Sequence, residues 1–281
     1  MSNDTILVLG GTGKTGRRIA PRLRARGHDV RTAARHGADV AFDWNDPATY
    51  DAALAGVGAL YLVPPGQQVD FVDEVTALLD RAEAAGVRHV TLLTAREVDT
   101  LPPEVPMRAA ELHLAGRAGL THAILRPGWF MQDFDEAFFL PAGGRLAVPS
   151  GDGAEAFVHA DDIADVAVAT LVAPAEHDRA GYTLTGPEAL TLADVADRIA
   201  KAAGRPVTHD NLPRDAWVEG LVGGGLPADY AELLGMLTAR LEAGVGSGTT
   251  DDIERVTGHP ARSFDDYASS PTALATWADV I

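Results

Sequence analysis

The first half of the chain alternates short apolar runs with segments whose apolar residues recur at helical spacing. The apolar runs predict strands at 6–9, 29–35, 41–44, 59–63, 88–95 and 121–127, and the periodic segments predict helices at about 15–27, 70–86 and 107–118. Continuous rather than alternating runs are typical of strands covered on both faces. Because the strands alternate with helices, we expect an α/β fold with a doubly wound parallel sheet.

The pattern changes beyond about residue 128. The segment 141–153 is rich in loop-forming residues. The segment 157–172 predicts a strand and then a helix, capped by Asp161 or Asp162. A further helix is predicted at 191–204, with Thr191 as its cap and Gly204 at its end.

This change in pattern predicts two regions of unequal size. We expect a nucleotide-binding domain at 1–170 and a smaller, mainly helical C-terminal cap at 171–281, to which part of 128–155 contributes. The cap is expected to cover the C-terminal edge of the sheet, where ligands bind in open α/β sheets.

Three glycines follow the first predicted strand. The sequence GTGKT within this stretch is similar to the phosphate cradle of an ATPase, but that motif requires a glycine at position 8, where Val8 stands. Gly10, Gly13 and Gly16 instead match a dinucleotide-binding turn, which directs the N-terminus of the following helix at a pyrophosphate. The context of strand, turn and helix therefore favours a Rossmann domain that binds a dinucleotide.

Residue types at two strand ends bear on which dinucleotide is bound. NAD-selective sites place a carboxylate after the second strand, whereas Arg35 occupies that position here. A guanidinium can hold a 2′-phosphate in bidentate fashion, and Lys14 in the glycine loop can reach the same group. We therefore expect NADP(H). Asp43 and Trp44 end the third strand and are expected to contact the adenine. The alternative is that Asp43 or Asn45 caps a helix and Trp44 is a core residue.

The composition excludes several classes of protein. A net charge of −17 argues against nucleic-acid binding, and no apolar run is long enough to span a membrane. The chain has no cysteine, and its nine histidines form no ligand pair at helical spacing, so we expect no metal. With no signal peptide visible in MSNDT, a cytoplasmic location and a small-molecule partner are expected.

Four motifs together resemble a known family. GGTGKTG, the AFDW strand end, LYLVPP at 60–65 and LRPGWFMQDF at 125–134 are similar to the NmrA-like atypical short-chain dehydrogenases, and most of all to their ergot-alkaloid iminium reductase branch. The resemblance implies that the cofactor groove is lined by Gly10, Gly13, Lys14, Thr15, Arg35, Asp43, Val63, Pro64 and Thr94. We expect Thr12, Gly16 and Trp44 to lie in the same groove.

The resemblance also implies that the segment 127–134 lies beside the nicotinamide. An aromatic, apolar substrate wall would then consist of Trp129, Phe130, Met131 and Phe134, with Met107 nearby. The alternative is that these residues form a core that joins the sheet to the cap.

The catalytic pair of ordinary short-chain dehydrogenases is absent. None of the five tyrosines has a lysine four residues later; by register, Pro103 and Met107 occupy those places. The chain thus lacks the usual acid for protonating an alkoxide, whereas hydride addition to an iminium carbon gives a neutral amine and needs no such acid. Glu111, Asp133 and Thr94 are the candidate catalytic residues; the two carboxylates are equally well read as a solvated helix residue and a helix cap.

These observations favour an NADPH-dependent oxidoreductase that reduces a small hydrophobic C=N or conjugated substrate in secondary metabolism. Two alternatives remain open. One is an NAD(P)H quinone reductase, and the other is a non-catalytic redox sensor that binds NADP and regulates a partner.

Overall fold

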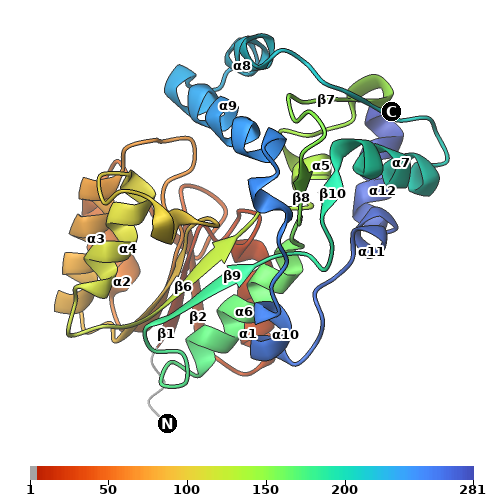
Figure 1. Ribbon diagram of the computed structural model, residues 1–281. Coiled ribbons are helices and arrows are strands. Elements are labelled where there is room, and N and C mark those ends of the chain that lie inside the picture. Colours follow the sequence, from red (N-terminus) through yellow and green to blue (C-terminus); the bar gives the residue numbers. More distant parts are fainter. Residues whose placement is uncertain (1–4) are drawn as a thin grey trace.

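The computed structural model describes residues 5–281. Residues 1–4, which belong to the stretch inspected for a signal peptide, lie outside this range. Figure 1 shows two layers of helices around a central sheet, with a second group of elements above the C-terminal ends of the strands.

The central sheet has seven parallel strands in the order β3-β2-β1-β4-β5-β6-β9. Its strands are β1 (Thr5–Leu9), β2 (Val30–Ala34), β3 (Val40–Ala41), β4 (Val57–Leu62), β5 (His89–Leu93), β6 (Thr121–Pro127) and β9 (Ala180–Leu184). Because the order reverses between β1 and β4, a crevice for ligands opens above these two strands. The predicted doubly wound sheet is confirmed.

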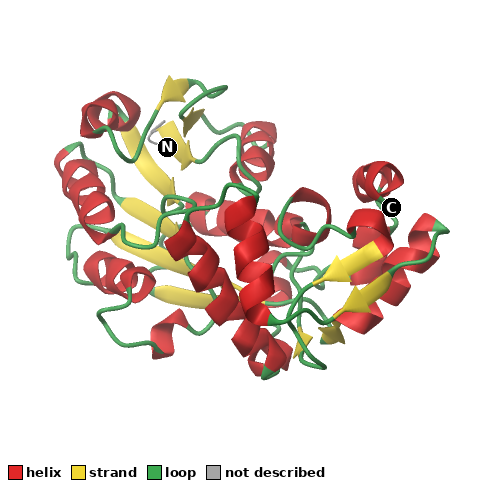
Figure 2. Ribbon diagram, turned by 90° about the horizontal axis from the view of Figure 1, so that it is seen from above, coloured by secondary structure: helices red, strands yellow, loops and turns green. Residues whose placement is uncertain are grey.

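Helices cover both faces of the sheet. One face carries α1 (Gly16–Ala25), α6 (Ala160–Val172) and α10 (Asp252–Thr257), which pack on it through Ile19, Ile163 and Ile253. The other face carries α2 (Tyr50–Leu54), α3 (Val72–Ala84) and α4 (Pro106–Ala115). Figure 2 shows the sheet between these layers from above.

Three local predictions need correction. β3 ends at Ala41 instead of reaching residue 44, because the chain turns where Oδ1 of Asp43 accepts the N–H of Asn45. The turn leads into the 3₁₀ helix η1 (Pro47–Thr49) and α2, which the apolar pattern does not predict. The cap of α6 is His159, whose Nδ1 accepts the N–H of Asp161 at 3.0 Å, so neither Asp161 nor Asp162 is the cap.

The seventh strand bears on the expected boundary at residue 170. β9 lies beyond that boundary, yet it pairs with β6 over five residues. α6 is the crossover helix between these two parallel strands, and a boundary after α6 separates it from the strand to which it leads.

The remaining elements form the cap. Its helices are α5 (Asp133–Glu136), α7 (Leu192–Ala203), α8 (Arg214–Gly223), α9 (Ala228–Glu242), α11 (Phe264–Ala268) and α12 (Pro271–Val280). Its strands pair two by two, β7 (Arg145–Ala147) with β11 (Thr208–Asp210) and β8 (Ala154–Glu155) with β10 (Leu190–Thr191). The cap also contains the 3₁₀ helices η3 (Ala142–Gly144) and η4 (Val245–Ser247), whereas η2 (Val98–Thr100) follows β5 and packs against α4.

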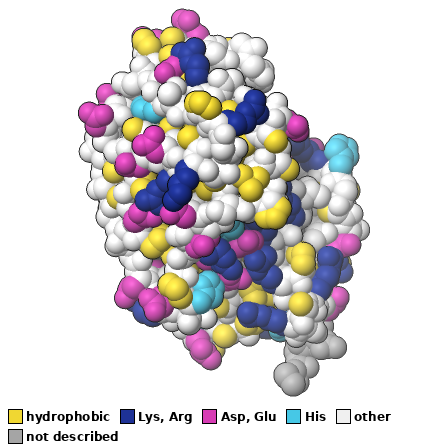
Figure 3. Space-filling model, turned by 90° about the vertical axis from the view of Figure 1, so that its right-hand side faces the viewer, with side chains coloured by type: hydrophobic (Ala, Val, Ile, Leu, Met, Phe, Trp, Pro, Cys, Tyr) yellow, Lys and Arg dark blue, Asp and Glu magenta, His cyan; other side chains and the backbone are white. Residues whose placement is uncertain are grey.

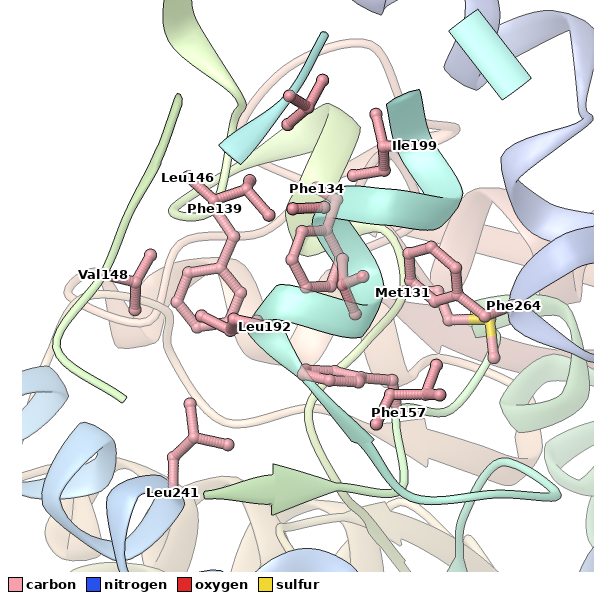
Figure 4. Close-up of a cluster of buried hydrophobic side chains, with 14 of the residues drawn as sticks. Met131, Phe134, Phe139, Leu146, Val148, Phe157, Leu192, Ile199, Leu241 and Phe264 are labelled. Atoms are coloured by element: carbon pink, nitrogen blue, oxygen red, sulfur yellow. The ribbon is translucent and has the colours of Figure 1, made fainter. Parts of the chain in front are cut away.

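The cap has its own hydrophobic core. Figure 4 shows the aromatic rings at its centre, among them Phe134, Phe139, Phe157 and Phe264. The predicted ends of α7 are confirmed: Thr191 forms a capping box with Asp194, and Gly204 follows the helix with a φ of 66°. No helix within residues 5–281 combines the length and apolar character needed to cross a membrane.

Candidate dinucleotide groove and adjoining cavity

The turn after β1 is built so that only glycine fits at key positions. Gly10 has a φ of 61°, and a Cβ there would lie 2.9 Å from Cγ1 of Val63. A Cβ on Gly16 would overlap the carbonyl group of Gly10, so the start of α1 packs directly on the turn. Glycine thereby allows the backbone to approach a ligand closely.

Several donors of this turn have no acceptor within the protein. Over residues 5–281 the backbone N–H groups of Thr12, Lys14 and Thr15 form no hydrogen bond. The first turn of α1 contains no acidic residue that would neutralise the positive end of its dipole. The residues present therefore fit the pyrophosphate of a dinucleotide.

A groove of about 710 Å³ runs from this turn across the crevice. All but two of the expected cofactor residues line it, namely Gly10, Thr12, Gly13, Lys14, Thr15, Arg35, Asp43, Trp44, Val63 and Pro64. Gly16 is buried beneath the turn, and Thr94 lines a neighbouring cavity instead. The groove also contains residues that were not expected to contact the cofactor, including His36, Asn45, Gln67 and Gln68.

Arg35 and Lys14 lie in different surroundings. Arg35 is exposed where β2 ends, next to His36, and forms no ion pair within the described chain. The ammonium of Lys14 lies 2.6 Å from Oδ1 of Asp133. Lys14 is thus paired with Asp133, which follows β6. Arg35 and His36 are then the basic residues at the end of β2.

Asp43 and Trp44 both line the groove, and Trp44 is also a core residue, so the two interpretations of this strand end do not exclude each other. Asp46, rather than Asp43 or Asn45, caps the 3₁₀ helix η1 by accepting the N–H of Ala48. Trp44 packs edge-on against Phe42 at 5.1 Å and also lines the groove. Trp44 therefore belongs both to the core and to the groove wall.

A second cavity of about 310 Å³ lies between the sheet and α9. Lys14 and Phe130 line both this cavity and the groove, so the two spaces adjoin. A volume of this size is suited to a small ligand. Trp129, Phe138, Leu234 and Leu237 give the cavity a largely apolar wall.

The expected substrate wall is only partly present. Trp129 and Phe130 line the cavity, whereas Met131 and Phe134 are buried in the cap core, where Phe134 contacts Phe139, Phe157 and Phe264. Met107 packs against the core on the α3 and α4 side of the sheet and does not line the cavity. The alternative of a joining core therefore applies to Met131 and Phe134.

Glu111 is a structural carboxylate. It is 1% exposed, and its two oxygens accept two hydrogen bonds of 2.8 Å from Arg126, one of 2.9 Å from Arg108 and one of 2.8 Å from Thr94. These contacts use its acceptor capacity, and the side chain does not line the cavity. The expectation of a solvated helix residue is corrected, because the carboxylate is buried.

The hydroxyl of Thr94 does line the cavity, but its proton is engaged. Because Oγ1 donates to Glu111, a ligand can use Thr94 only as an acceptor. Asp133 lines the cavity too, with Lys14 on Oδ1 and the N–H of Phe130 on Oδ2 at 3.2 Å. Burial raises the pKa of Asp133, and the neighbouring ammonium opposes that shift.

Several cavity residues, most of them in the cap, were not predicted from the sequence. Tyr230, Leu234, Leu237 and Leu241 of α9 line the cavity, as do Glu155 of β8 and Arg96, which follows β5. The four α9 residues recur at helical spacing, and this stripe is a signal that was available in the sequence. Periodicity identifies an apolar face but does not say whether it meets a core or a cavity.

One cluster of potential metal ligands is accounted for by an arginine. The ligand atoms of Asp162, Asp165 and His259 lie within 4.8 Å of one another. The guanidinium of Arg262 bonds to both carboxylates and supplies the compensating positive charge.

Figure 3 shows basic and acidic side chains interspersed on the face that it presents, rather than a single basic patch.

Comparisons with known proteins agree with this geometry. A family model described as NAD(P)H-binding matches residues 10–174, more than half of the chain. The chain is 35% identical to YesF of Bacillus subtilis, an uncharacterized oxidoreductase, with 98% of each chain covered. It is 32% identical to agroclavine dehydrogenase of Claviceps fusiformis, with 94% of this chain and 96% of that protein covered.

Two solved structures share the fold. NmrA, a negative transcriptional regulator, in complex with NAD has a TM-score of 0.77 and 17% identity, covering 100% of this chain and 99% of its own. The quinone oxidoreductase QOR2 of Escherichia coli, in complex with NADPH, has a TM-score of 0.74 and 24% identity, covering 94% of this chain and 98% of its own. From the family match and the homologous oxidoreductases together, the chain belongs to the NAD(P)H-binding family, shares the fold of NmrA and is an NAD(P)H-dependent oxidoreductase.

Proposed function

We propose that the protein is a reductase of the atypical short-chain dehydrogenase type that takes NADPH in preference to NADH and transfers hydride to a small apolar substrate with a C=N bond. The observation that carries this proposal is the junction between the groove and the cavity, at Lys14 and Phe130. A nicotinamide in the groove would meet a substrate in the cavity there.

The preference for NADPH is supported by the basic end of β2. Arg35 is exposed and free of an ion pair within residues 5–281, and His36 lines the groove beside it. A guanidinium in this position favours a 2′-phosphate, which a carboxylate would repel.

Reduction of C=N is supported by the two cavity residues that the sequence offered as catalytic candidates, because neither has a free proton to give. The Thr94 hydroxyl donates to Glu111, and Asp133 is paired with Lys14. Hydride addition to an iminium cation yields a neutral amine, so the step is balanced without a proton donor. The chain's contribution is then to orient the substrate against the cofactor and to exclude water. The similarity to agroclavine dehydrogenase points in the same direction.

Quinone reduction is the second candidate, favoured by one residue. Tyr230 lines the cavity and carries a hydroxyl, and a quinone needs a proton as well as a hydride. Burial raises the pKa of Tyr230, which makes it a weaker acid and places this candidate second.

The test is NADPH oxidation by the purified protein with two acceptors, the cation N-methyl-dihydroisoquinolinium and the quinone menadione. We expect faster turnover with the iminium cation. Faster turnover with menadione would favour the second candidate. If NADPH binds but neither acceptor is reduced, and NADPH and NADP⁺ differ in affinity, the sensor alternative gains support.

A further inference from the structure

Glu155 is a buried carboxyl group in the wall of the cavity. It lies in β8, is 4% exposed and lines the cavity beside Trp129 and Gly246. Its Oε1 is buried and has no hydrogen-bond partner within the described residues. A buried polar atom without a partner is costly, and such an atom in a cavity wall calls for a ligand.

Two glycines leave the space that the carboxyl group occupies. A Cβ on Gly128 would lie 2.7 Å from Oε1, and a Cβ on Gly246 would overlap Oε2. Both glycines line the same cavity. Side chains at either position would displace the carboxyl group, so the surrounding backbone is shaped to hold it.

The other charged groups of the cavity have partners. Lys14 pairs with Asp133, and Glu97 pairs with Arg240 of α9. Arg96 donates Nη1 to the carbonyl oxygens of Gly246 and Gly248 at 2.8 and 2.9 Å. Among the charged residues that line the cavity within 5–281, Glu155 is the carboxyl group with no ion pair.

We propose that Glu155 is the counter-ion for a cationic substrate and selects organic cations, such as iminium ions, over neutral molecules of the same shape. This inference rests on the proposed function, because it takes the cavity to be the substrate site. A cation gains most from a carboxylate that is shielded from water, and its own charge offsets the cost of burying that carboxylate.

The binding of a permanent cation should then release a proton. Burial raises the pKa of Glu155 to about 7; the charge of Arg96 and a hydrogen bond from the backbone of Trp129 lower it, and Glu97 raises it. A bound cation favours the ionised form of the carboxyl group. We therefore expect cation binding to release protons near neutral pH.

The experiment is calorimetric titration of the NADP⁺-loaded protein at pH 7 in two buffers of different ionisation enthalpy. The probe is N-methyl-dihydroisoquinolinium, and its neutral comparison is the lactam N-methyl-dihydroisoquinolinone. In the wild type, only the cation should show a heat that depends on the buffer. Glu155→Gln should lose that dependence and bind the cation at least about tenfold more weakly, with lactam affinity changed by less than about twofold.

Glu188→Gln, a substitution of the same type on a partly exposed carboxylate paired with Arg198, is the matched control and should behave as the wild type does. The inference is overturned if the wild type binds no cation, binds the cation no more tightly than the lactam, or if Glu155→Gln binds the cation equally well. The wild-type measurement decides the matter even if the variant does not fold. Cation binding without NADPH oxidation would count against the proposed function alone.

Discussion

The ammonium of Lys14 and the carboxylate of Asp133 lie 2.6 Å apart although they are 119 residues apart in the sequence. This ion pair ties the glycine-rich turn to α5, the first helix of the cap. Lys14 is therefore directed towards the junction of the groove and the cavity, and Arg35 stands alone with His36 at the end of β2.

Replacement of Lys14 should affect both cofactors equally. Lys14→Met removes a positive charge from the turn that holds the pyrophosphate, which NADPH and NADH share. We expect both dissociation constants to rise by about tenfold, with their ratio unchanged. Fluorescence titration of the two cofactors measures this; a loss confined to NADPH would instead assign Lys14 to the 2′-phosphate.

Replacement of Arg35 should change the ratio of the NADPH and NADH dissociation constants. Arg35→Ala removes the guanidinium expected to hold the 2′-phosphate, so NADPH should bind about ten- to a hundredfold more weakly while NADH is little affected. The same fluorescence titration of the two cofactors measures this change. An unaltered ratio of the two affinities would remove Arg35 from the site.

Trp129 should affect turnover rather than cofactor binding. Trp129→Ala deletes a large part of the cavity wall, so we expect kcat/KM for the iminium substrate to fall by about tenfold or more, with NADPH affinity nearly unchanged. Met236→Ala, on α9 but 61% exposed, is the control for a truncated apolar residue. Equal kinetics for the wild type and Trp129→Ala would exclude this residue from the substrate wall.

Glu111 should matter for stability. Glu111→Ala leaves the guanidinium of Arg126 without its bidentate partner and frees the Thr94 hydroxyl. Breaking a buried ion pair from one side costs about 3 kcal/mol of unfolding free energy. Urea denaturation measures this loss, with the exposed Glu104→Ala as control; a loss no larger than that of the control would contradict the structural role.

Glu155 should make the stability depend on pH. Burial raises its pKa from the usual 4.5 to about 7, so the folded state holds the proton more tightly than the unfolded state. Its contribution is therefore fully present below pH 4.5 and is lost as the pH rises through about 7. Relative to the wild type, Glu155→Gln should gain on the order of 2 kcal/mol between pH 4 and pH 8. Parallel denaturation profiles across this range would contradict the raised pKa.

Local features of the sequence predict the sheet and the glycine-rich turn. The run from Ile6 to Leu9, followed by Gly10, Gly13 and Gly16, contains the strand, the turn and the helix start within about a dozen neighbouring residues. Neighbouring residues determine such elements directly. The groove lining follows because the fold fixes where the strand ends meet.

Features that depend on contacts between residues far apart in the sequence could not be predicted from neighbouring residues. Within LRPGWFMQDF, only the folded cap shows that Trp129 and Phe130 face the cavity while Met131 and Phe134 face the core. Likewise Glu155 and Tyr230 reach the cavity from elements that have no pattern specific to a site. Their placement depends on how the cap packs on the sheet.

The most direct measurement follows deuterium from NADPH labelled at the reactive carbon of the nicotinamide. The purified protein is supplied with N-methyl-dihydroisoquinolinium, and the amine product is analysed by mass spectrometry and NMR. We predict one deuterium at the former iminium carbon, delivered from one face of the nicotinamide and dependent on Trp129. An unlabelled amine, or no amine although NADPH is bound, would contradict hydride transfer to a C=N substrate.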